Sequence, residues 1–213
     1  MRFLSEMLKL YAITDNACLR GRDLTEQVEL ALQGGVTCVQ LRDKGLSTDE
    51  LVDEARNLIP ICHRYGAPLI INDDYRAAML SGADGVHVGI EDAPVAEIRR
   101  IAGEDFIIGA TAKTVEQASA AEKMGADYLG VGAVFPSPTK KNAIRITPDN
   151  LREIAASVKI PICAIGGITA ENIHEIAGCG QQGFAVVSAV FAAEDVKSAA
   201  QLLRQKAEEG TGK

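Results

Sequence analysis

Short apolar runs alternate with longer amphipathic runs along the whole chain. The apolar runs are five to seven residues long and rich in Val, Ile, Leu and Ala, which is typical of strands buried on both faces. Eight of them predict strands at Leu8–Thr14, Cys38–Arg42, Pro68–Asn72, Gly85–Gly89, Phe106–Ala110, Tyr128–Val134, Pro161–Ile165 and Phe184–Ser188.

The runs between these strands repeat apolar residues at helical spacing. Residues that cap helix N-termini precede several of them, among them Ser47, Thr114 and Thr147. The pattern predicts helices at Leu24–Gln33, Asp49–Arg64, Tyr75–Leu80, Pro94–Ile101, Val115–Lys123, Pro148–Ser157, Ala170–Ile176 and Val196–Glu208.

Strict alternation of strands and helices predicts an α/β protein with a parallel sheet. Eight units within 213 residues favour closure into a (β/α)8 TIM barrel over an open sheet. No linker or low-complexity segment divides the chain. We therefore expect a single TIM-barrel domain over residues 1–213, with a frayed tail after Glu208.

Composition agrees with this fold and narrows the range of partners. Hydrophobic residues make up 47% of the chain, but Trp is absent and aromatic residues are only 4%, so the core must consist mainly of aliphatic side chains. A net charge of −7 argues against nucleic acid or an anionic membrane as the main partner. An anionic ligand would need a local cluster of cations.

The cysteines and the N-terminus predict a cytoplasmic protein. The five cysteines are odd in number and lack Cys-x-x-Cys spacing, which is typical of reduced core thiols. The first eleven residues lack the apolar segment of a signal peptide, and no apolar stretch reaches the ~18 residues of a membrane span.

In a barrel of this type the catalytic groups lie at the C-terminal ends of the strands. The second strand ends Gln40-Leu41-Arg42-Asp43-Lys44. Because side chains alternate along a strand, Gln40, Arg42 and Lys44 share one face and are expected at the barrel mouth. A solvated strand end without function is the alternative.

Carboxylates follow the next two strands. Asp73 and Asp74 come after strand three, and Asp92 comes after strand four. In a site rich in cations, such carboxylates suit Mg²⁺ that also holds substrate phosphates. Helix capping is the alternative, above all for Asp74 and Asp92. His87, inside a strand, is more typical of a hydrogen-bonded core residue than of a catalyst.

Further anion-binding groups follow the later strands. Thr111 and Lys113 come after strand five, a Pro-punctuated turn with Ser137, Thr139 and Lys140 follows strand six, Gly166-Gly167 follows strand seven, and Ser188 ends strand eight. Loops after strands seven and eight recurrently bind phosphate in this architecture. Two anion sites at one mouth would accept one substrate with two phosphates or two phosphorylated substrates.

Taken as an ordered set, these motifs resemble the thiamine phosphate synthase family over residues 8–205. The matching stretches are 39–44 (VQLRDK), 70–73 (IIND), 84–89 (DGVHVG) with Glu91 and Asp92, 126–132 (ADYLGVG) leading to 136–141 (PSPTKK), 164–168 (AIGGI) and 185–188 (AVVS). Each stretch alone is weak, whereas the ordered set is specific.

The resemblance implies a transferase that joins 4-amino-2-methyl-5-hydroxymethylpyrimidine diphosphate to 4-methyl-5-(2-phosphoethyl)thiazole and releases pyrophosphate. It implies that Mg²⁺ binds Asp73 and Asp92, and that Arg42, Lys44 and Lys140 neutralise the leaving group. By position, the pyrimidine diphosphate would contact Gln40, Leu41, Arg42, Asp43, Lys44, Asn72, Thr111 and Lys140. The thiazole phosphate would contact Ser137, Pro138, Thr139, Gly167, Val187 and Ser188.

The chain departs from the family pattern at three positions. Family members commonly carry Ser at Thr111, His at Lys113 and Gln at Ile90; Thr111 keeps the hydroxyl, and the other two are unexplained. The alternatives are a related thiazole tautomerase, which needs that missing His as its acid–base group, and a non-catalytic phosphate-binding barrel. An unrelated phosphosugar isomerase would need a carboxylate base and no pair of metal-binding carboxylates. The sequence leaves the oligomeric state open, a homo-oligomer included.

Overall fold

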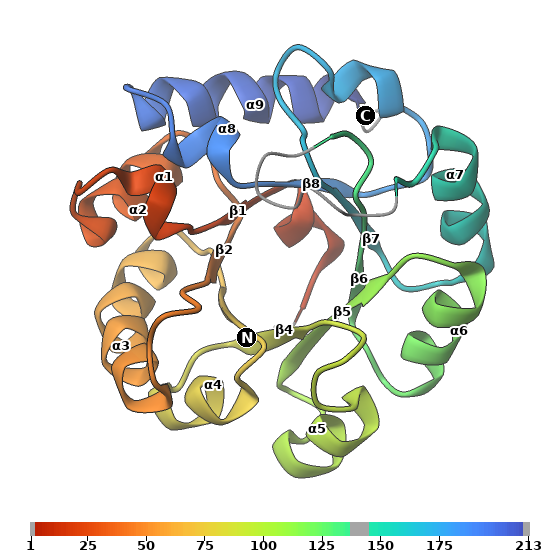
Figure 1. Ribbon diagram of the computed structural model, residues 1–213, viewed down its shortest axis with the longest axis horizontal. Coiled ribbons are helices and arrows are strands. Elements are labelled where there is room, and N and C mark those ends of the chain that lie inside the picture. Colours follow the sequence, from red (N-terminus) through yellow and green to blue (C-terminus); the bar gives the residue numbers. More distant parts are fainter. Residues whose placement is uncertain (1–2, 137–144, 211–213) are drawn as a thin grey trace.

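The computed structural model describes residues 3–136 and 145–210, and in it eight parallel strands close into a barrel. Each strand pairs with its neighbours in chain order, and the eighth pairs with the first (Figure 1). The predicted (β/α)8 class is confirmed. The strands are β1 (Leu10–Ile13), β2 (Cys38–Leu41), β3 (Leu69–Asn72), β4 (Gly85–Val88), β5 (Ile107–Ala112), β6 (Tyr128–Gly132), β7 (Ile162–Ile165) and β8 (Gly183–Val186).

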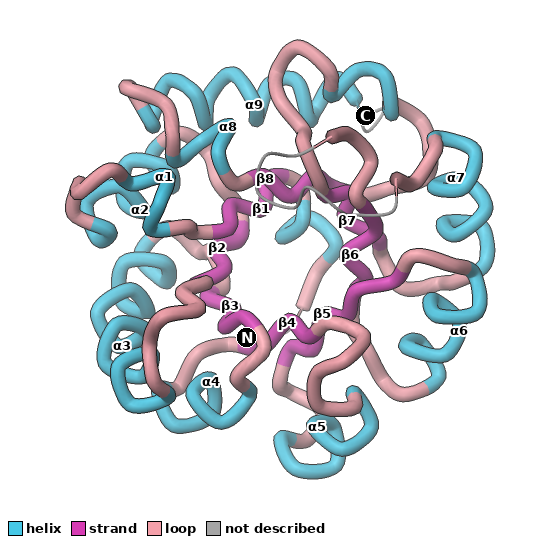
Figure 2. The backbone as a smooth tube through the Cα atoms, viewed as in Figure 1, coloured by secondary structure: helices cyan, strands magenta, loops and turns pink. Residues whose placement is uncertain are grey.

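Helices surround the ring of strands, as Figure 2 shows. None of those in the described ranges is both long and apolar enough to cross a bilayer. The α-helices are α1 (Asn16–Leu19), α2 (Leu24–Gln33), α3 (Thr48–Arg64), α4 (Tyr75–Ser81), α5 (Val95–Ala102), α6 (Val115–Lys123), α7 (Pro148–Ser157), α8 (Ser188–Phe191) and α9 (Val196–Gly210), and the 3₁₀ turns are η1 (Ser5–Leu8) and η2 (Ile173–Ile176).

The prediction of a helix over Ala170–Ile176 is wrong, because only η2 forms there. The side chain of Asn172 accepts a hydrogen bond from the Thr169 N–H at 2.9 Å and donates one to the Gly167 carbonyl at 2.8 Å. These two bonds hold the segment before Ile173 as a turn. Ala177, with ψ of 137°, then ends the segment after a single 3₁₀ turn, and Gly178 follows with φ of +70°.

Strand ends also differ from the predicted bounds at both ends of the chain. The expected first strand begins two residues late, at Leu10, because Ser5–Leu8 form η1. The expected eighth strand stops at Val186, because Ser188 already begins α8. Val187 therefore lies in the turn between β8 and α8, and Ser188 is the first residue of α8, so their side chains do not alternate as they would in a strand.

The strands carry two cores, one on each face. Along β1, Leu10 and Ala12 belong to the large aliphatic cluster between strands and helices, whereas Tyr11 and Ile13 belong to a smaller cluster inside the barrel. This is the period-two alternation expected of a strand buried on both sides.

The N-terminal segment closes the end of the barrel where the strands begin. In Figure 1 it crosses the ring of strands, and the Phe3 ring stacks on Tyr128 with centroids 5.5 Å apart. Leu8, in η1, is fully buried in the inner cluster. The N-terminal segment thus fills the interior near the N-terminal ends of the strands, and the cavity opens at their C-terminal ends.

Candidate functional site

A cavity of about 530 Å³ occupies the C-terminal mouth of the barrel, and residues that follow or end all eight strands line it. The mouth is the part of this architecture where catalytic groups lie. Its two halves differ in chemistry: charged side chains gather after β2, β3 and β4, and glycines with small residues gather after β6, β7 and β8.

The end of β2 supplies the cations that the alternation predicts. Gln40, Arg42 and Lys44 all line the cavity. The Arg42 guanidinium lies 3.2 Å from a carboxylate oxygen of Asp15, and the Arg42 backbone N–H donates to the Thr14 hydroxyl at 2.9 Å. These contacts hold Arg42 at the mouth with its charge only partly neutralised.

The two alternate residues of this stretch turn away from the cavity. The Leu41 side chain packs in the cluster between strands and helices. The Asp43 carboxylate accepts a hydrogen bond from the Gly45 N–H at 2.8 Å and another from the Asn16 amide. Neither side chain lines the cavity, so a ligand could reach these two residues only through their backbone.

Asp73 and Asp74 are neighbours in the chain with opposite orientations. The Asp74 carboxylate caps α4, accepting from the Arg76 and Ala77 N–H groups at 3.0 and 2.9 Å, and also accepts from the Thr48 hydroxyl. Asp73 has φ of +62°, in the left-handed region that Asp tolerates better than most residues. That backbone conformation turns its carboxylate into the cavity beside Asn72.

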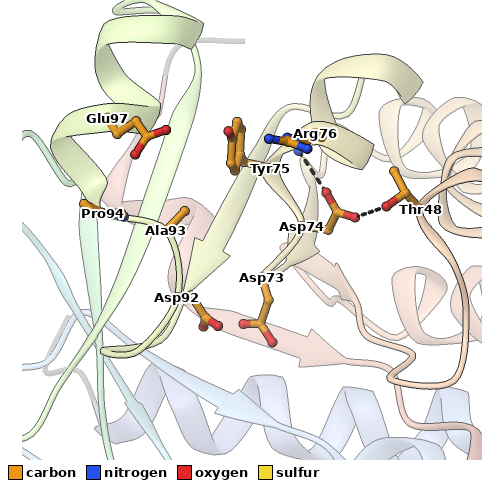
Figure 3. Close-up of a pocket in the computed structure, with 9 residues that line it drawn as sticks. All are labelled: Thr48, Asp73, Asp74, Tyr75, Arg76, Asp92, Ala93, Pro94 and Glu97. Carbon is orange, nitrogen blue, oxygen red and sulfur yellow. Dashed lines mark hydrogen bonds between the residues drawn. The ribbon is translucent and has the colours of Figure 1, made fainter.

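Asp92 faces Asp73 from the end of the neighbouring strand. Figure 3 shows the two carboxylates pointing toward one another while Asp74 turns toward Thr48. One Asp92 oxygen accepts from the Gly89 N–H at 2.7 Å, and α5 begins after Pro94 without a side-chain cap. Asp92 therefore holds its own loop and does not cap the helix.

Burial and the neighbouring Asp92 carboxylate perturb Asp73. Partial burial, followed by the hydrogen bond and negative charge of Asp92, raises the pKa of Asp73, and Lys44 opposes the shift. Such a pair disfavours two adjacent negative charges unless a cation lies near. In the described ranges no cluster of three or more His, Cys, Asp or Glu residues could hold a metal ion.

Two carboxylates are typical of Mg²⁺ sites in which water and ligand phosphates complete the coordination of the ion. A second pocket of about 560 Å³, lined by Thr48, Tyr75, Arg76 and Glu97 among others, opens on the outer side of the same pair. Asp73 and Asp92 line both pockets. Their oxygens can therefore be approached from the barrel mouth and from solvent between α4 and α5.

The opposite half of the mouth is formed by backbone. Gly166 and Gly167 have φ of +105° and +64°, and a Cβ on Gly167 would lie 2.3 Å from the Pro136 carbonyl oxygen. Val187 and Ser188 complete this side. The sequence-predicted Ser137, Pro138, Thr139 and Lys140 lie outside the described residues.

Sequence reasoning missed two tyrosines on the cavity floor. Tyr11 and Tyr128 are both about fully buried, with 2% and 1% of their surface exposed, and their hydroxyls are 2.8 Å apart. Tyr128 also bonds His87, whose other ring nitrogen lies 3.1 Å from the Thr111 hydroxyl. The available signal was a polar aromatic residue at an inward-facing position of an apolar run.

His87 is hydrogen-bonded within the barrel, as expected, and it also lines the cavity. The two departures, Ile90 and Lys113, line the mouth as well. Ile90 has 51% of its surface exposed. The structure shows no contact that explains either substitution.

A family model described as thiamine monophosphate synthase matches residues 10–190. A thiamine-phosphate synthase of Clostridium tetani is 44% identical over 194 residues, which is 91% of this chain and 93% of that protein. One of Shouchella clausii is 42% identical over 95% of this chain and 98% of that protein. The solved structure of a thiamine phosphate pyrophosphorylase from Pyrococcus furiosus is 42% identical, covers 99% of this chain and 100% of that one, and superimposes with a TM-score of 0.90.

Proposed function

This chain belongs to the thiamine monophosphate synthase family, and from that membership we propose that it catalyses thiamine phosphate formation. The reaction joins the pyrimidine methylene of 4-amino-2-methyl-5-hydroxymethylpyrimidine diphosphate to the ring nitrogen of 4-methyl-5-(2-phosphoethyl)thiazole. The bond to pyrophosphate breaks, and a carbon–nitrogen bond forms. The observation that carries the proposal is one mouth with ionic groups on one side and a glycine-lined backbone on the other.

The ionic side suits the diphosphate. Arg42 and Lys44 line the cavity, and both would contact oxygens that gain negative charge as pyrophosphate departs. Gln40, Asn72 and Thr111 add uncharged hydrogen-bonding groups on the same side. Lys140, which lies outside the described residues, is assigned to the leaving group by family resemblance alone.

Asp73 and Asp92 are the residues that would hold Mg²⁺. A divalent ion bound there would neutralise diphosphate charge. Within the protein itself, Asp92 sets the position of its loop through the Gly89 N–H, and the left-handed backbone of Asp73 aims the second carboxylate at it.

The glycine side suits the thiazole phosphate. Gly167, Val187 and Ser188 line the cavity, and the absence of a side chain at Gly167 lets a ligand approach the backbone closely. Ser137, Pro138 and Thr139 are assigned here by resemblance. Holding both substrates in one cavity aims the thiazole nitrogen at the pyrimidine methylene.

The reaction needs no general base, because the thiazole nitrogen attacks with its own lone pair. The electron-rich aminopyrimidine stabilises the cation left by pyrophosphate. This fits a site whose described histidine, His87, already bonds Tyr128 and Thr111. A thiazole tautomerase is not favoured, since Lys113 stands where that enzyme needs its His.

A direct assay tests the proposal. The full chain is incubated with both substrates and Mg²⁺, and thiamine phosphate and pyrophosphate are quantified. We expect the two products in equal amounts, and neither when either substrate is left out. No product under these conditions, with the fold verified by circular dichroism, would refute the synthase assignment.

The cysteines support a cytoplasmic location. All five are free thiols, and four of them are buried. Burial raises the pKa of the Cys62 thiol to about 12, so that thiol stays protonated and unreactive at neutral pH. Unpaired buried cysteines are typical of proteins kept in a reducing compartment.

A further inference from the structure

Five polar side chains form a continuous hydrogen-bonded row across the cavity floor. The Gln40 amide N–H donates to the Tyr11 hydroxyl at 2.7 Å, and the Tyr11 hydroxyl lies 2.8 Å from that of Tyr128. The Tyr128 hydroxyl lies 3.1 Å from Nδ1 of His87, and Nε2 of His87 lies 3.1 Å from the Thr111 hydroxyl. We call this set the floor row. It starts and ends at residues that line the cavity.

Neighbouring strands leave space for the floor row by carrying glycine. A Cβ on Gly109 would lie 2.1 Å from Cζ of Tyr128 and 2.5 Å from Nδ1 of His87. A Cβ on Gly130 would lie 3.0 Å from Cε1 of His87. Any side chain at Gly109 would occupy the place of the bond between Tyr128 and His87, so the row depends on that glycine.

Aromatic packing fixes the centre of the row. The Tyr128 ring stacks on the Phe3 ring and meets the Tyr11 ring edge-on, with centroids 5.9 Å apart in the second pair. Its centroid lies 5.5 Å from that of the His87 ring. Such contacts restrain ring orientation as well as burying apolar surface. The hydroxyls of both tyrosines therefore have few orientations available.

The Gln40 amide donates to the Tyr11 hydroxyl, and one proton order that satisfies every contact continues from there. In that order Tyr11 donates to the Tyr128 oxygen, and Tyr128 donates to Nδ1 of His87. Burial raises the pKa of both tyrosines well above the ordinary value, so each has one proton to donate. An imidazole that accepts at Nδ1 carries its proton on Nε2 and donates it to Thr111.

We propose that Tyr11, Tyr128 and His87 are positioning residues that maintain one proton order from Gln40 to Thr111. The order leaves the Gln40 carbonyl oxygen as an acceptor at the cavity and the Thr111 hydroxyl as a donor. The floor therefore selects a ligand that places an N–H donor over Gln40 and an acceptor over Thr111, and it rejects the reverse pattern.

One consequence rests on the proposed function. An aminopyrimidine diphosphate carries an exocyclic N–H donor on C4 and, at the opposite side of the ring, the lone pair of ring nitrogen N1, which accepts. Bound with its amino group over Gln40, it would match both ends of the row. The row would thus act on the pyrimidine substrate and leave the thiazole phosphate unaffected.

The proton order can be measured on the free protein by ¹⁵N NMR of histidine-labelled full-length chain. The sequence has only three histidines, so His63 and His174 serve as internal references. We expect His87 as the neutral tautomer protonated at Nε2. Protonation at Nδ1, or at both nitrogens near neutral pH, would overturn the proposal whether or not the protein makes thiamine phosphate.

A substitution at the far end of the row tests transmission. In Gln40→Glu, measured at about pH 9.5 because a buried Glu can have a pKa of ~8–9, the carboxylate must accept from Tyr11. Every proton then reverses, and His87 becomes protonated at Nδ1. The same change made in a Tyr11→Phe background should leave the tautomer of that background unaltered. An unchanged tautomer in Gln40→Glu, or an equal change in both backgrounds, would refute the row.

A kinetic measurement complements the spectra and keeps the proposal testable if Gln40→Glu does not fold. In Tyr128→Phe we expect kcat/KM for the pyrimidine diphosphate to fall about tenfold, the scale of one or two hydrogen bonds, with KM for the thiazole phosphate unchanged. Equal losses for both substrates would indicate a merely structural role. Products absent even from the unsubstituted protein would refute the proposed function and leave the tautomer result standing.

Discussion

The β2–β4 half of the mouth and the β6–β8 half present different chemistry to the same cavity. The first offers charged side chains, with Arg42 and Lys44 on one strand end and Asp73 facing Asp92 beside them. The second offers Gly166, Gly167, Val187 and Ser188, which carry no net charge. Charge acts over several ångströms and weakens with salt, whereas backbone donors act only at contact.

Because of this difference, substitutions in the two halves should have different effects. Loss of a charged group on the first half should change electrostatics and leave the fold intact, because these side chains are partly exposed. A substitution on the second half should change backbone conformation itself. The following experiments separate the two behaviours.

The largest effect is expected from Asp92→Asn. The amide oxygen keeps the bond from the Gly89 N–H, now 2.7 Å, so the loop should hold its position. One of the two carboxylates proposed for Mg²⁺ is lost, and turnover should fall about 100-fold or more, the scale of removing one electrostatic stabiliser. Turnover is measured against Mg²⁺ concentration, with the exposed Asp105→Asn as matched control. Full activity in Asp92→Asn would remove the metal assignment.

The next effect tests the backbone half through Gly167→Ala. The new Cβ would lie 2.3 Å from the Pro136 carbonyl oxygen, and φ is +64°. We expect KM for the thiazole phosphate to rise at least about tenfold, since the backbone must move to relieve this contact and the movement misplaces the groups that face the ligand.

Gly82→Ala is the matched control for backbone conformation. Gly82 has φ of +80° and ψ of +21°, and its Cβ would meet no atom within 4 Å. This substitution carries the left-handed penalty of about 1–2 kcal/mol without a collision. Thermal unfolding should shift in both variants, and KM only in Gly167→Ala. A normal thiazole KM in Gly167→Ala would show that the glycine half does not contact this substrate.

Arg42→Gln should have a smaller effect, confined to the charged half. We expect KM for the pyrimidine diphosphate to rise about tenfold, in line with loss of one charge-assisted hydrogen bond. The salt dependence of that KM should become weaker, while KM for the thiazole phosphate stays constant. Asp15→Asn removes the charge 3.2 Å from Arg42 but keeps an acceptor oxygen that holds the guanidinium in place, so it should change either KM less than about twofold. Equal rises for both substrates would contradict the division of the mouth.

The smallest effect is a pH-dependent change in stability on Asp73→Asn. A raised folded-state pKa means that ionisation of Asp73 costs stability, and this cost grows as pH rises through that pKa. Asn also tolerates the left-handed φ of +62°. At neutral pH the free energy of unfolding of the variant should be higher than that of the unsubstituted protein by at most about 1 kcal/mol, because the group is partly solvated.

The gain from Asp73→Asn should disappear below the ordinary Asp pKa of 3.8, where the carboxyl is protonated in both folded and unfolded chains. Urea unfolding at neutral and acidic pH, without added Mg²⁺, measures the difference. A gain that is equal at both pH values would mean that ionisation of the partly buried Asp73 beside Asp92 is not its source.

Much of the fold could be predicted because each element is encoded by its own residues. The bounds of α2, α6 and α7 agree with the apolar periodicity residue for residue. The prediction failed at Ala170–Ile176, where the side chain of Asn172 binds backbone that a helix would have used. A hydrogen bond of that kind competes with the helix and leaves no trace in apolar periodicity.

The candidate site was predictable where alternation along one strand decides it, and less so elsewhere. Gln40, Arg42 and Lys44 share a face because side chains of a strand alternate. The contrast between Asp73 and Asp74 rests on one left-handed residue, which two adjacent aspartates in a sequence do not reveal. Leu41 and Asp43 belong to the same motif as Arg42, yet their side chains point elsewhere.

By itself the sequence determined the alternation of strands and helices, the closed barrel and the cations at the end of the second strand. The alternation and the cations follow from patterns within local stretches, and the closed barrel was inferred from eight such units in a chain of this length. Only the tertiary structure decided that Tyr11 meets Tyr128, 117 residues away, and that Asp73 faces Asp92. Such meetings depend on the register with which eight strands close, and that register is set by packing around the whole ring, which no local stretch of sequence contains.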